Sequence, residues 1–577
     1  MADIEHIRHS LAHLLATAVL EYDPKAKLAI GPTIENGFYY DILFSAPLGA
    51  EMMPKFEKKM RGLVKRKLAF ERIATTPAEA RKQFADQPFK IELIDELEKN
   101  GEDITLYKTG DFIDLCRGGH VDDTSEIPAD AFALSRIAGA YWRGDEKREM
   151  LTRIYGIAFA TKQELDEYVK MQEEARARDH RKLGTELDLF VFSDLVGGGL
   201  PLFTPRGTII RDLLDSFVWE FRRKRGYERV DIPHITKKDL YEKSGHWKKF
   251  ADELFRITTR EKHEFAMKPM NCPHHTQIYA RRAWSYRDMP QRYASTTKVY
   301  RDEQSGELAG LTRVRSITQD DSHVFCRASQ VAEEFGAIWD IIETFYTTFG
   351  FELSVRLSFH DPEHFEKYIG TEKIWHDAEV ALRDIAEKRK ASYFEARGEA
   401  AMYGPKIDFM AKDSLGRSHQ VATIQLDMNM PDRFDLVCVN EKGEKERIVM
   451  IHSAVMGSIE RFMAVLIEHT AGNFPVWLSP VQVRVLPIGK DHQAFAQKVS
   501  DDLRAAGVRT EFDDSNETLG KKVRQAKQEK VPYYLIIGGE EVKMNAVTVE
   551  SRDTGKVGAM SVTDFLARVE EEIKTRS

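Results

Sequence analysis

The sequence has few cysteines and no long apolar run, and these absences exclude several classes of protein. Four cysteines in 577 residues cannot form a disulfide framework, so we expect a protein of the reducing cytoplasm. No apolar run approaches the roughly 18 residues that a membrane-spanning helix needs. The first residues are charged and contain no apolar signal region. Internal repeats and low-complexity tracts are absent too, and we predict a cytoplasmic protein without a membrane partner.

The charge balance limits how the chain can bind nucleic acid. The formal net charge is −8 at pH 7, so any contact with RNA must come from local basic stripes on an acidic body. Charged residues make up 31% of the chain and hydrophobic residues 42%, which is ordinary for globular proteins. The length exceeds what one hydrophobic core supports, and we expect three or four domains.

The sequence does contain three separated residues that suit a metal: Cys272, His323 and His452. One thiolate and two imidazoles are typical zinc ligands, and three protein ligands leave a fourth position open for a substrate. The three residues form no local Cys-x-x-Cys or His-x-x-x-His pattern. Spacing alone therefore also allows a buried, unreactive cysteine and two ordinary histidines. The surrounding segments favour the zinc site.

Those segments carry a resemblance to a known family. They are Met-Asn-Cys-Pro (270–273), Tyr-Arg-Asp-Glu-Gln-Ser-Gly (300–306), Thr-Gln-Asp-Asp-Ser-His (318–323), Tyr-Gly-Pro-Lys-Ile-Asp-Phe (403–409), Gln-Leu-Asp (425–427) and Gly-Ser-Ile-Glu-Arg (457–461). The chain resembles the threonyl-tRNA synthetases, which are class II aminoacyl-tRNA synthetases, over nearly its whole length. Many members begin with a small ubiquitin-like domain, whereas this sequence begins directly at the domain that follows.

The resemblance implies an α+β multidomain protein with a class II antiparallel-sheet catalytic domain. We predict an N-terminal α/β editing domain (1–160), a linker helix (161–185), a catalytic domain with zinc and ATP sites (186–478) and a C-terminal α/β anticodon-binding domain (479–577). The linker is expected to be one charged helix with Gly184 as its cap, either a solvated connector or one whose basic face lies near tRNA. After Pro480, strands alternate with helices, which predicts a parallel sheet.

The implied activity is the ligation of L-threonine to tRNA(Thr) by a homodimer that uses ATP with Mg²⁺ and one Zn²⁺ per subunit. Adenylate formation needs positioning and charge neutralisation, which arginine supplies to phosphates. The resemblance assigns Arg301 to the α-phosphate, Glu303 to the adenine amino group and Arg461 to the γ-phosphate or the adenine face. Arg313 is a further ATP contact. Ile317 stands where the family often has a phenylalanine that stacks on adenine.

The implied zinc explains the choice of amino acid. In the family, threonine binds zinc through its amino group and its hydroxyl, and valine is rejected because it has no hydroxyl. The ligands would be the three residues named above. The residues implied in substrate binding are Gln319, Asp321, Tyr403 and Gln425. For Tyr403 and Gln425, the alternative is that they are ordinary strand residues.

Serine requires a second site, because it differs from threonine by one methyl group, worth only about 1–3 kcal/mol. His9 and His13 lie one helical turn apart, and Asp114, Cys116 and His120 follow in a second segment. Spacing alone also suits a second zinc site. The resemblance instead assigns these residues to an editing pocket that works without metal. His13 and Lys90 would position or activate water, Asp114 would select the seryl group, and the identity of the base stays open. A domain that only docks tRNA is the plainer alternative.

The C-terminal domain offers candidate anticodon contacts. Asn516 and Glu541 fall where the family reads bases, and unstacked bases are usually read by hydrogen bonds to their edges. Glu550 replaces a frequent arginine and would repel phosphate, so we expect Arg552, two residues on along the same strand face, to substitute. The alternative is that Asn516 and Glu541 are surface loop residues.

Three other functions compete with this interpretation. A prolyl- or seryl-tRNA synthetase would share the class II motifs but not the Cys272, His323 and His452 set. A catalytically silent paralogue that acts as an RNA-binding or regulatory subunit would have lost Arg301, Arg461 or a zinc ligand, and all are present. A metallohydrolase built on the N-terminal His/Cys cluster leaves two-thirds of the chain unexplained.

Overall fold

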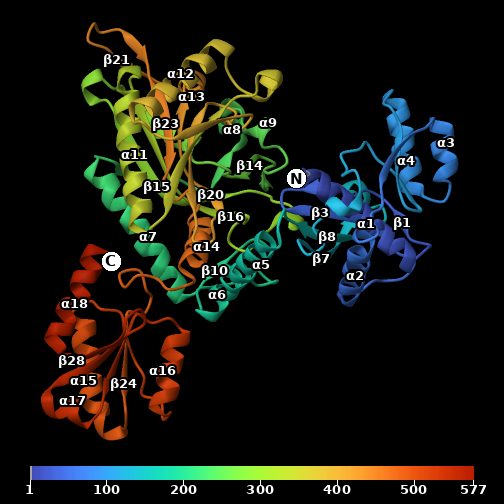
Figure 1. The fold of residues 1–577 in the computed structure, drawn as a ribbon. Coiled ribbons are helices and arrows are strands. Elements are labelled where there is room, and N and C mark those ends of the chain that lie inside the picture. Colours follow the sequence, from blue (N-terminus) through green and yellow to red (C-terminus); the bar gives the residue numbers. More distant parts are fainter. Residues whose placement is uncertain (1–2, 577) are drawn as a thin grey trace. The chain divides into compact units, whose positions relative to one another are not determined.

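The computed structural model describes residues 3–576. The chain divides into two compact units, Met1–Glu174 and Ala175–Ser577 (Figure 1). Each unit has its own hydrophobic core. In the described part of the chain, no helix is long and apolar enough to cross a membrane.

The N-terminal unit is built on a five-stranded antiparallel sheet with the order β1-β3-β8-β7, in which β2 also pairs with β3. The strands are β1 (Lys27–Leu28), β2 (Thr33–Ile34), β3 (Gly37–Leu43), β7 (Phe132–Tyr141) and β8 (Met150–Ala158). Helices α1 (Ile4–Tyr22) and α2 (Met53–Val64) bury their apolar faces in the core that this sheet forms. Asp3 is the N-cap of α1, and its carboxylate accepts a hydrogen bond from the Glu5 amide in the first turn.

A smaller subdomain of the same unit contains a three-stranded sheet, β4-β5-β6, with its own apolar cluster. Its elements are β4 (Phe70–Ala74), α3 (Pro77–Gln83), α4 (Pro88–Lys99), β5 (Thr105–Thr109) and β6 (Phe112–Leu115). The end of β6 brings Asp114 and Cys116 close to α1, and α4 brings Lys90 to the same place. The two subdomains therefore meet at the predicted editing residues.

The linker is two helices rather than the single helix we expected. They are α5 (Lys162–Ala177) and α6 (His180–Glu186). Asp179 breaks the run because it has non-helical backbone angles and its carboxylate accepts from the Arg181 amide at 2.8 Å, which makes it the N-cap of α6. Gly184 lies inside α6 and is not a cap. A Cβ there would meet the Phe190 ring at 2.2 Å, so the glycine allows close packing.

The second unit is dominated by an eight-stranded sheet with the order β11-β15-β16-β23-β20-β19-β17-β18, antiparallel except at its two outer pairs. The strands are β11 (Glu228–Arg229), β15 (Gln291–Tyr300), β16 (Ser316–Cys326), β17 (Glu352–Phe359), β18 (Tyr393–Arg397), β19 (Lys406–Lys412), β20 (Ser418–Asp427) and β23 (Val449–Ala454). The main core forms where α7 (Pro205–Lys224), α11 (Val331–Thr348), α12 (Glu372–Lys388) and α14 (Ile459–Thr470) pack against it. The antiparallel sheet that we predicted for this part of the chain is therefore present.

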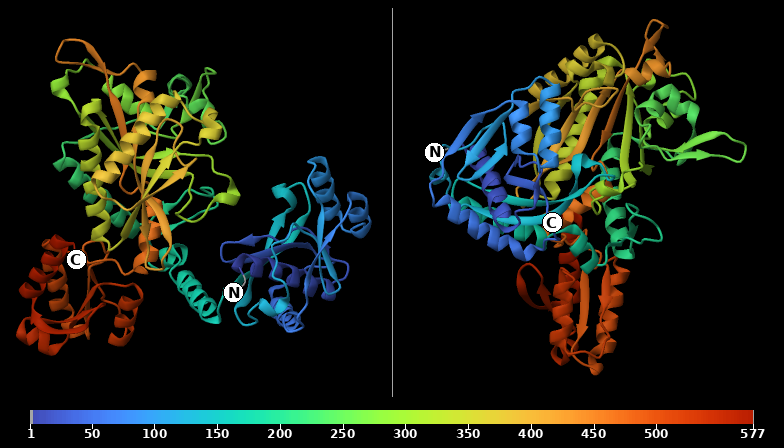
Figure 2. Two further views of the ribbon diagram at one scale, coloured as in Figure 1. Left: turned by 45° about the horizontal axis from the view of Figure 1, so that its top comes forward. Right: turned by 90° about the vertical axis from the view of Figure 1, so that its right-hand side faces the viewer.

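The C-terminal part of this unit is a five-stranded sheet with the order β25-β24-β26-β27-β28, flanked by helices on both faces (Figure 2). The elements are β24 (Val483–Pro487), α15 (Gln493–Ala505), β25 (Thr510–Phe512), α16 (Leu519–Gln528), β26 (Tyr533–Ile537), α17 (Gly539–Met544), β27 (Ala546–Ser551), β28 (Gly555–Ser561) and α18 (Val562–Thr575). Helices α15 and α18 share one apolar cluster and α16 belongs to another. The predicted parallel pairing holds for β25-β24-β26 only, because β27 pairs antiparallel with β26 and β28 pairs antiparallel with β27.

Candidate functional site

Strand β16 carries a row of functional side chains on one face. Successive side chains of a strand point to opposite faces, so Ile317, Gln319, Asp321 and His323 share the open face. Two of the intervening residues contact the helices behind the sheet. Thr318 donates to Glu460 of α14 at 2.6 Å, and the backbone carbonyl of Asp320 accepts a hydrogen bond from Arg222 of α7. The strand alternation therefore connects an ATP-side position, Ile317, with a metal-side position, His323.

The three predicted zinc ligands come together on this face. In the sheet register His452 of β23 lies directly opposite His323, and Cys272 begins α10 (Cys272–Tyr279) above them. All three residues are buried, and their ligand atoms lie within 4.8 Å of one another. His323 Nε2 is 3.0 Å from His452 Nδ1, close to the roughly 3.3 Å separation of two nitrogens on a tetrahedral zinc with bonds of about 2.0–2.1 Å. The donor set fits zinc.

Two residues that the sequence analysis missed orient the imidazoles. The Asp427 carboxylate lies 2.9 Å from His452 Nε2, which places the proton there and leaves Nδ1 free as a ligand. His275 Nδ1 lies 2.7 Å from His323 Nδ1, and its other nitrogen lies 3.1 Å from the Ser295 hydroxyl. The signal was available, because Asp427 and His275 lie in or beside quoted segments, but only the sheet register brings them together.

The protonation of the ligand set follows from its burial. Burial lowers the pKa of His323 well below its usual value, and the neighbouring His452 lowers it further. Burial raises the pKa of the Cys272 thiol well above its usual value, and Asp321 adds to this effect. The imidazole is therefore neutral and able to bind a metal, whereas the thiol keeps its proton until a metal displaces it.

The side chains predicted to bind threonine surround this ligand set. Asp321 accepts a hydrogen bond from the Asn271 amide at 3.0 Å and its second oxygen is 3.8 Å from His323 Nε2. The Tyr403 ring centre lies 4.9 Å from that of His452. Gln425 lies opposite His452 in the register and donates to the Gly404 carbonyl at 2.9 Å. A carboxylate beside a metal position can accept a hydrogen bond from the amino group of an amino acid.

A cavity of about 480 Å³ contains the predicted ATP residues. It is lined by Arg301, Glu303, Thr312, Arg313, Val314, Ile317, Gln319, Gln420, Val421, Thr423, Met456, Gly457, Ser458, Arg461 and Phe462. Arg313 forms an ion pair with Glu303 at 2.7 Å. Within residues 3–576, Arg301 and Arg461 have no carboxylate partner within 4.0 Å, and the Arg301 Nε is buried without a hydrogen bond. Two unpaired guanidinium groups on one cavity suit an anionic ligand such as a polyphosphate.

The position of Ile317 in this cavity leads to a test of the adenine contact. We expect Ile317→Phe to lower the KM for ATP by roughly two- to tenfold, because a ring–ring contact adds about 0.5–1.5 kcal/mol. ATP-dependent pyrophosphate exchange at varied ATP measures this change. Ile317→Leu, which keeps an aliphatic face at the same place, is the control. A KM for ATP that stays constant or rises in the phenylalanine variant contradicts the prediction.

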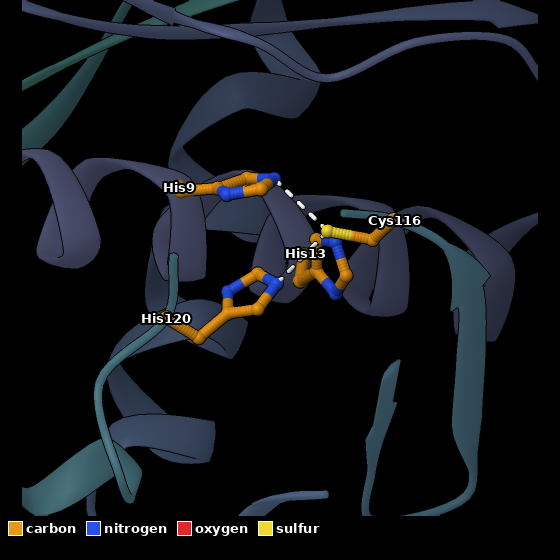
Figure 3. A group of neighbouring side chains, drawn as sticks. All are labelled: His9, His13, Cys116 and His120. Carbon is orange, nitrogen blue, oxygen red and sulfur yellow. Dashed lines mark hydrogen bonds between the residues drawn. The ribbon is translucent and has the colours of Figure 1, made fainter. Parts of the chain in front are cut away.

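In the N-terminal unit, His9, His13, Cys116 and His120 form one cluster (Figure 3). The Cys116 sulfur lies 3.4 Å from His9 Nε2 and 3.2 Å from His120 Nε2. The ligand atoms of all four residues lie within 4.8 Å of one another, so the cluster has the donors for a metal as well as for a hydrolytic pocket. Cys116 is half-buried, with its thiol pKa raised by burial to about 11.

Lys90 and Asp114 form a buried ion pair beside this cluster. Lys90 Nζ is 2.5 Å from Asp114 Oδ1 and 3.1 Å from the Tyr40 hydroxyl, which donates to the second oxygen of Asp114. The sequence analysis missed Tyr40. Burial and the nearby His9 and Lys90 lower the pKa of His13 well below its usual value. His13 is therefore neutral, and its Nδ1 is buried without a hydrogen-bond partner in the described part of the chain.

The structure places the two anticodon candidates differently. Asn516 is exposed. Glu541 accepts from the Gly538 amide at 2.9 Å and from the Thr548 hydroxyl at 2.7 Å, so it also caps α17. Arg552 cannot substitute for an arginine at Glu550 as we expected. Its guanidinium donates to the carbonyls of Phe474 and Lys530, each at 3.0 Å, because the chain has already turned out of β27.

Comparison with known families agrees with this geometry. Residues 255–470 match the tRNA synthetase class II core domain (G, H, P, S and T), which includes the ATP cavity and all three ligands of the Cys/His site. Residues 482–572 match an anticodon binding domain. Residues 104–155 match the threonyl and alanyl tRNA synthetase second additional domain.

Relatives that match over nearly the whole chain identify the family within this class. Threonine–tRNA ligase of Gloeobacter violaceus is 46% identical over 100% of this chain and 93% of its own length. That of Rubrobacter xylanophilus is 47% identical over 99% and 89%. The solved RNA binding domain of threonyl-tRNA synthetase from Cryptosporidium parvum superposes with a TM-score of 0.65 at 36% identity, covering 68% of this chain and 98% of that one. The chain belongs to the threonine–tRNA ligases, class II aminoacyl-tRNA synthetases.

Proposed function

We propose that this enzyme activates L-threonine with ATP and Mg²⁺, transfers it to tRNA(Thr), and hydrolyses mischarged seryl-tRNA(Thr) in its N-terminal unit. The observation that carries the proposal is the open face of β16. It runs from the ATP cavity at Ile317 and Gln319 to a Cys/His₂ ligand set at His323. An amino acid held at the Cys/His₂ ligand set would have its carboxylate next to a nucleotide in the ATP cavity.

Arginine and carboxylate side chains would bind and orient both substrates at the synthetic site. Arg301 and Arg461 would bind the phosphates and neutralise the charge that develops as the threonine carboxylate attacks. Glu303, now paired with Arg313, would accept from the adenine amino group. Asp321 would accept a hydrogen bond from the amino group of threonine, since its carboxylate is oriented by Asn271.

Cys272, His323 and His452 would hold the zinc, one ion per subunit. Bound there, zinc supplies a Lewis-acid position for the substrate hydroxyl, so a substrate without a hydroxyl leaves that position unfilled. Tyr403 and Gln425 would complete the pocket wall around the side chain. The fit of the donor set and the orientation of His452 by Asp427 support this assignment.

The buried ion pair of Lys90 and Asp114 suggests different roles for Lys90 and His13 in the editing pocket. Lys90 is held by Asp114 and Tyr40 as a fixed positive charge, which suits stabilisation of a developing oxyanion. His13 is neutral and its Nδ1 has no hydrogen-bond partner among the described residues, so it is the group that would take a proton from water. His9, Cys116 and His120 would shape the pocket.

Assembly and location are further parts of the proposal. Membership of the class supports a homodimer. The four cysteines are free, and none forms a disulfide in the described residues, which supports the reducing cytoplasm. Asn516 and Glu541 remain our candidates for reading the anticodon.

Charging of tRNA(Thr) with threonine, serine and valine, together with quantification of bound zinc, tests the proposal. We expect stable threonyl-tRNA, transient seryl-tRNA, no valyl-tRNA and one zinc per chain. Persistent seryl-tRNA would show that the N-terminal unit does not edit. No charging by the folded protein would favour a regulatory paralogue, and two zinc ions per chain would assign a metal to the His9, His13, Cys116 and His120 cluster.

A further inference from the structure

A buried histidine outside the ATP cavity connects two of its walls. His180 is the first residue of α6, and this helix lies beside α14 (Figure 1). Its Nε2 accepts a hydrogen bond from the Leu311 amide at 3.0 Å, and its Nδ1 lies 2.7 Å from the Glu468 carboxylate. Because Nε2 accepts, the ring proton is on Nδ1 and is donated to Glu468.

Both partners of His180 belong to segments that carry ATP residues. Leu311 lies two positions before Arg313 in the loop that also bears Glu303, and it is fully buried. Glu468 lies about two turns after Arg461 on α14. One imidazole therefore links the backbone of the adenine-side loop to the helix that bears the second phosphate-binding arginine.

The same carboxylate connects His180 to a third wall. Glu468 also accepts from Arg417, whose guanidinium binds Asp413. These residues close the hairpin between β19 and β20, and β20 supplies Gln420 and Thr423 to the cavity lining. The network therefore joins the loop, α14 and β20 behind the cavity, and His180 is the member of it that bonds the loop backbone.

The loop is shaped to approach His180 closely. Gly310 has a φ of +54°, a left-handed conformation that favours glycine, and a Cβ there would lie 2.3 Å from His180 Nε2. The Gly310–Leu311 backbone thus packs directly against the imidazole. If His180 only shielded the loop from solvent, the loop backbone would not need to contact the polar end of the imidazole ring.

We infer that His180 is a positioning residue for adenylate formation, which holds the Glu303–Arg313 loop at the distance from Arg461 that ATP requires. The inference rests on the proposed ATP site. It assigns to the linker helix a part in nucleotide binding through the loop rather than through contact with ATP. Loss of the Leu311 bond would free the loop and weaken the binding of ATP more than that of threonine.

Two substitutions of His180 separate its two hydrogen bonds. In His180→Asn the short amide can still donate to Glu468 but cannot reach Leu311, whereas in His180→Gln the longer side chain can offer an oxygen to the Leu311 amide. We expect the asparagine variant to raise the KM for ATP about tenfold, in line with one lost buried hydrogen bond, and the glutamine variant to recover most of it. The KM for threonine, the melting temperature and seryl-tRNA deacylation should change little.

The substitution of His180 needs a control at another histidine. His376→Asn, an exposed histidine of α12, is the matched control and should leave the KM for ATP unchanged. An unchanged KM for ATP in His180→Asn, or equal losses in every readout, would overturn the inference while the wild type still catalyses pyrophosphate exchange. Absence of exchange in the wild type would overturn the proposed function itself. If His180→Asn fails to fold, Gly310→Ala decides, since it displaces the loop with His180 intact and should raise the same KM.

Discussion

Cys272→Ala is expected to remove the zinc from the enzyme and to lower kcat/KM for threonine activation by about 100-fold or more. Loss of residues that merely orient metal ligands typically costs 10–100-fold, and Cys272 is itself the thiolate of a three-residue set. His323 and His452 remain 3.0 Å apart in the variant, but two imidazoles alone bind zinc weakly. Metal analysis and pyrophosphate exchange with threonine measure the two effects.

The control for Cys272→Ala is Cys326→Ala, which removes another fully buried sulfur, this one from the main core. Both variants create a cavity and should lower stability by a similar amount. We expect only Cys272→Ala to lose zinc, and the KM for ATP should stay near that of the wild type in both. Full zinc occupancy in Cys272→Ala would place the metal elsewhere, and loss of zinc with unchanged threonine activation would remove it from substrate binding.

The order of the synthetic-site residues along one strand could be predicted from the sequence. Once the Thr-Gln-Asp-Asp-Ser-His segment is taken as a strand, alternation puts Gln319, Asp321 and His323 on one face. The hydrogen-bond partners of these residues could not be predicted from the sequence. Asp427 meets His452 because β20 and β23 pair in a particular register, and His275 meets His323 through the packing of α10 on β16. Single-chain patterns do not fix such registers.

The errors have local physical causes. The break in the linker was signalled by Asp179, a residue type that caps helices, but the strong helical charge pattern on both sides concealed it. Arg552 was expected to face RNA because it lies two residues beyond Glu550, yet β27 ends at Ser551 and the rule of alternation no longer applies. Tyr40 was missed because it meets Asp114 across 74 positions of sequence.

The same long-range packing decides which editing residue should be changed in a test. Lys90 looks like the obvious target, but its removal would leave the buried Asp114 carboxylate without its cationic partner. Breaking a buried ion pair in this way typically costs about 3–5 kcal/mol, so loss of editing would be mixed with unfolding of the domain. His13 avoids this problem, because its Nδ1 has no hydrogen-bond partner within residues 3–576 that a substitution would remove.

His13→Asn is therefore expected to slow the deacylation of seryl-tRNA(Thr) by about 100-fold or more, the usual contribution of a general base. Charging with threonine should be unchanged, since the substitution lies in the other unit, and seryl-tRNA should accumulate. In the wild type, burial holds the pKa of His13 well below its usual value. The neutral base should therefore persist, and the deacylation rate should not fall between about pH 8 and about pH 6.

His6→Asn is the matched control, because His6 is an exposed histidine of the same helix. It should deacylate seryl-tRNA at the wild-type rate. A wild-type rate in His13→Asn would exclude His13 as the base and leave the water to be activated by the substrate itself or by the fixed charge of Lys90. A rate that falls steeply as the pH drops from about 8 to about 6 would point to a base with an ordinary histidine pKa, which the buried His13 does not have.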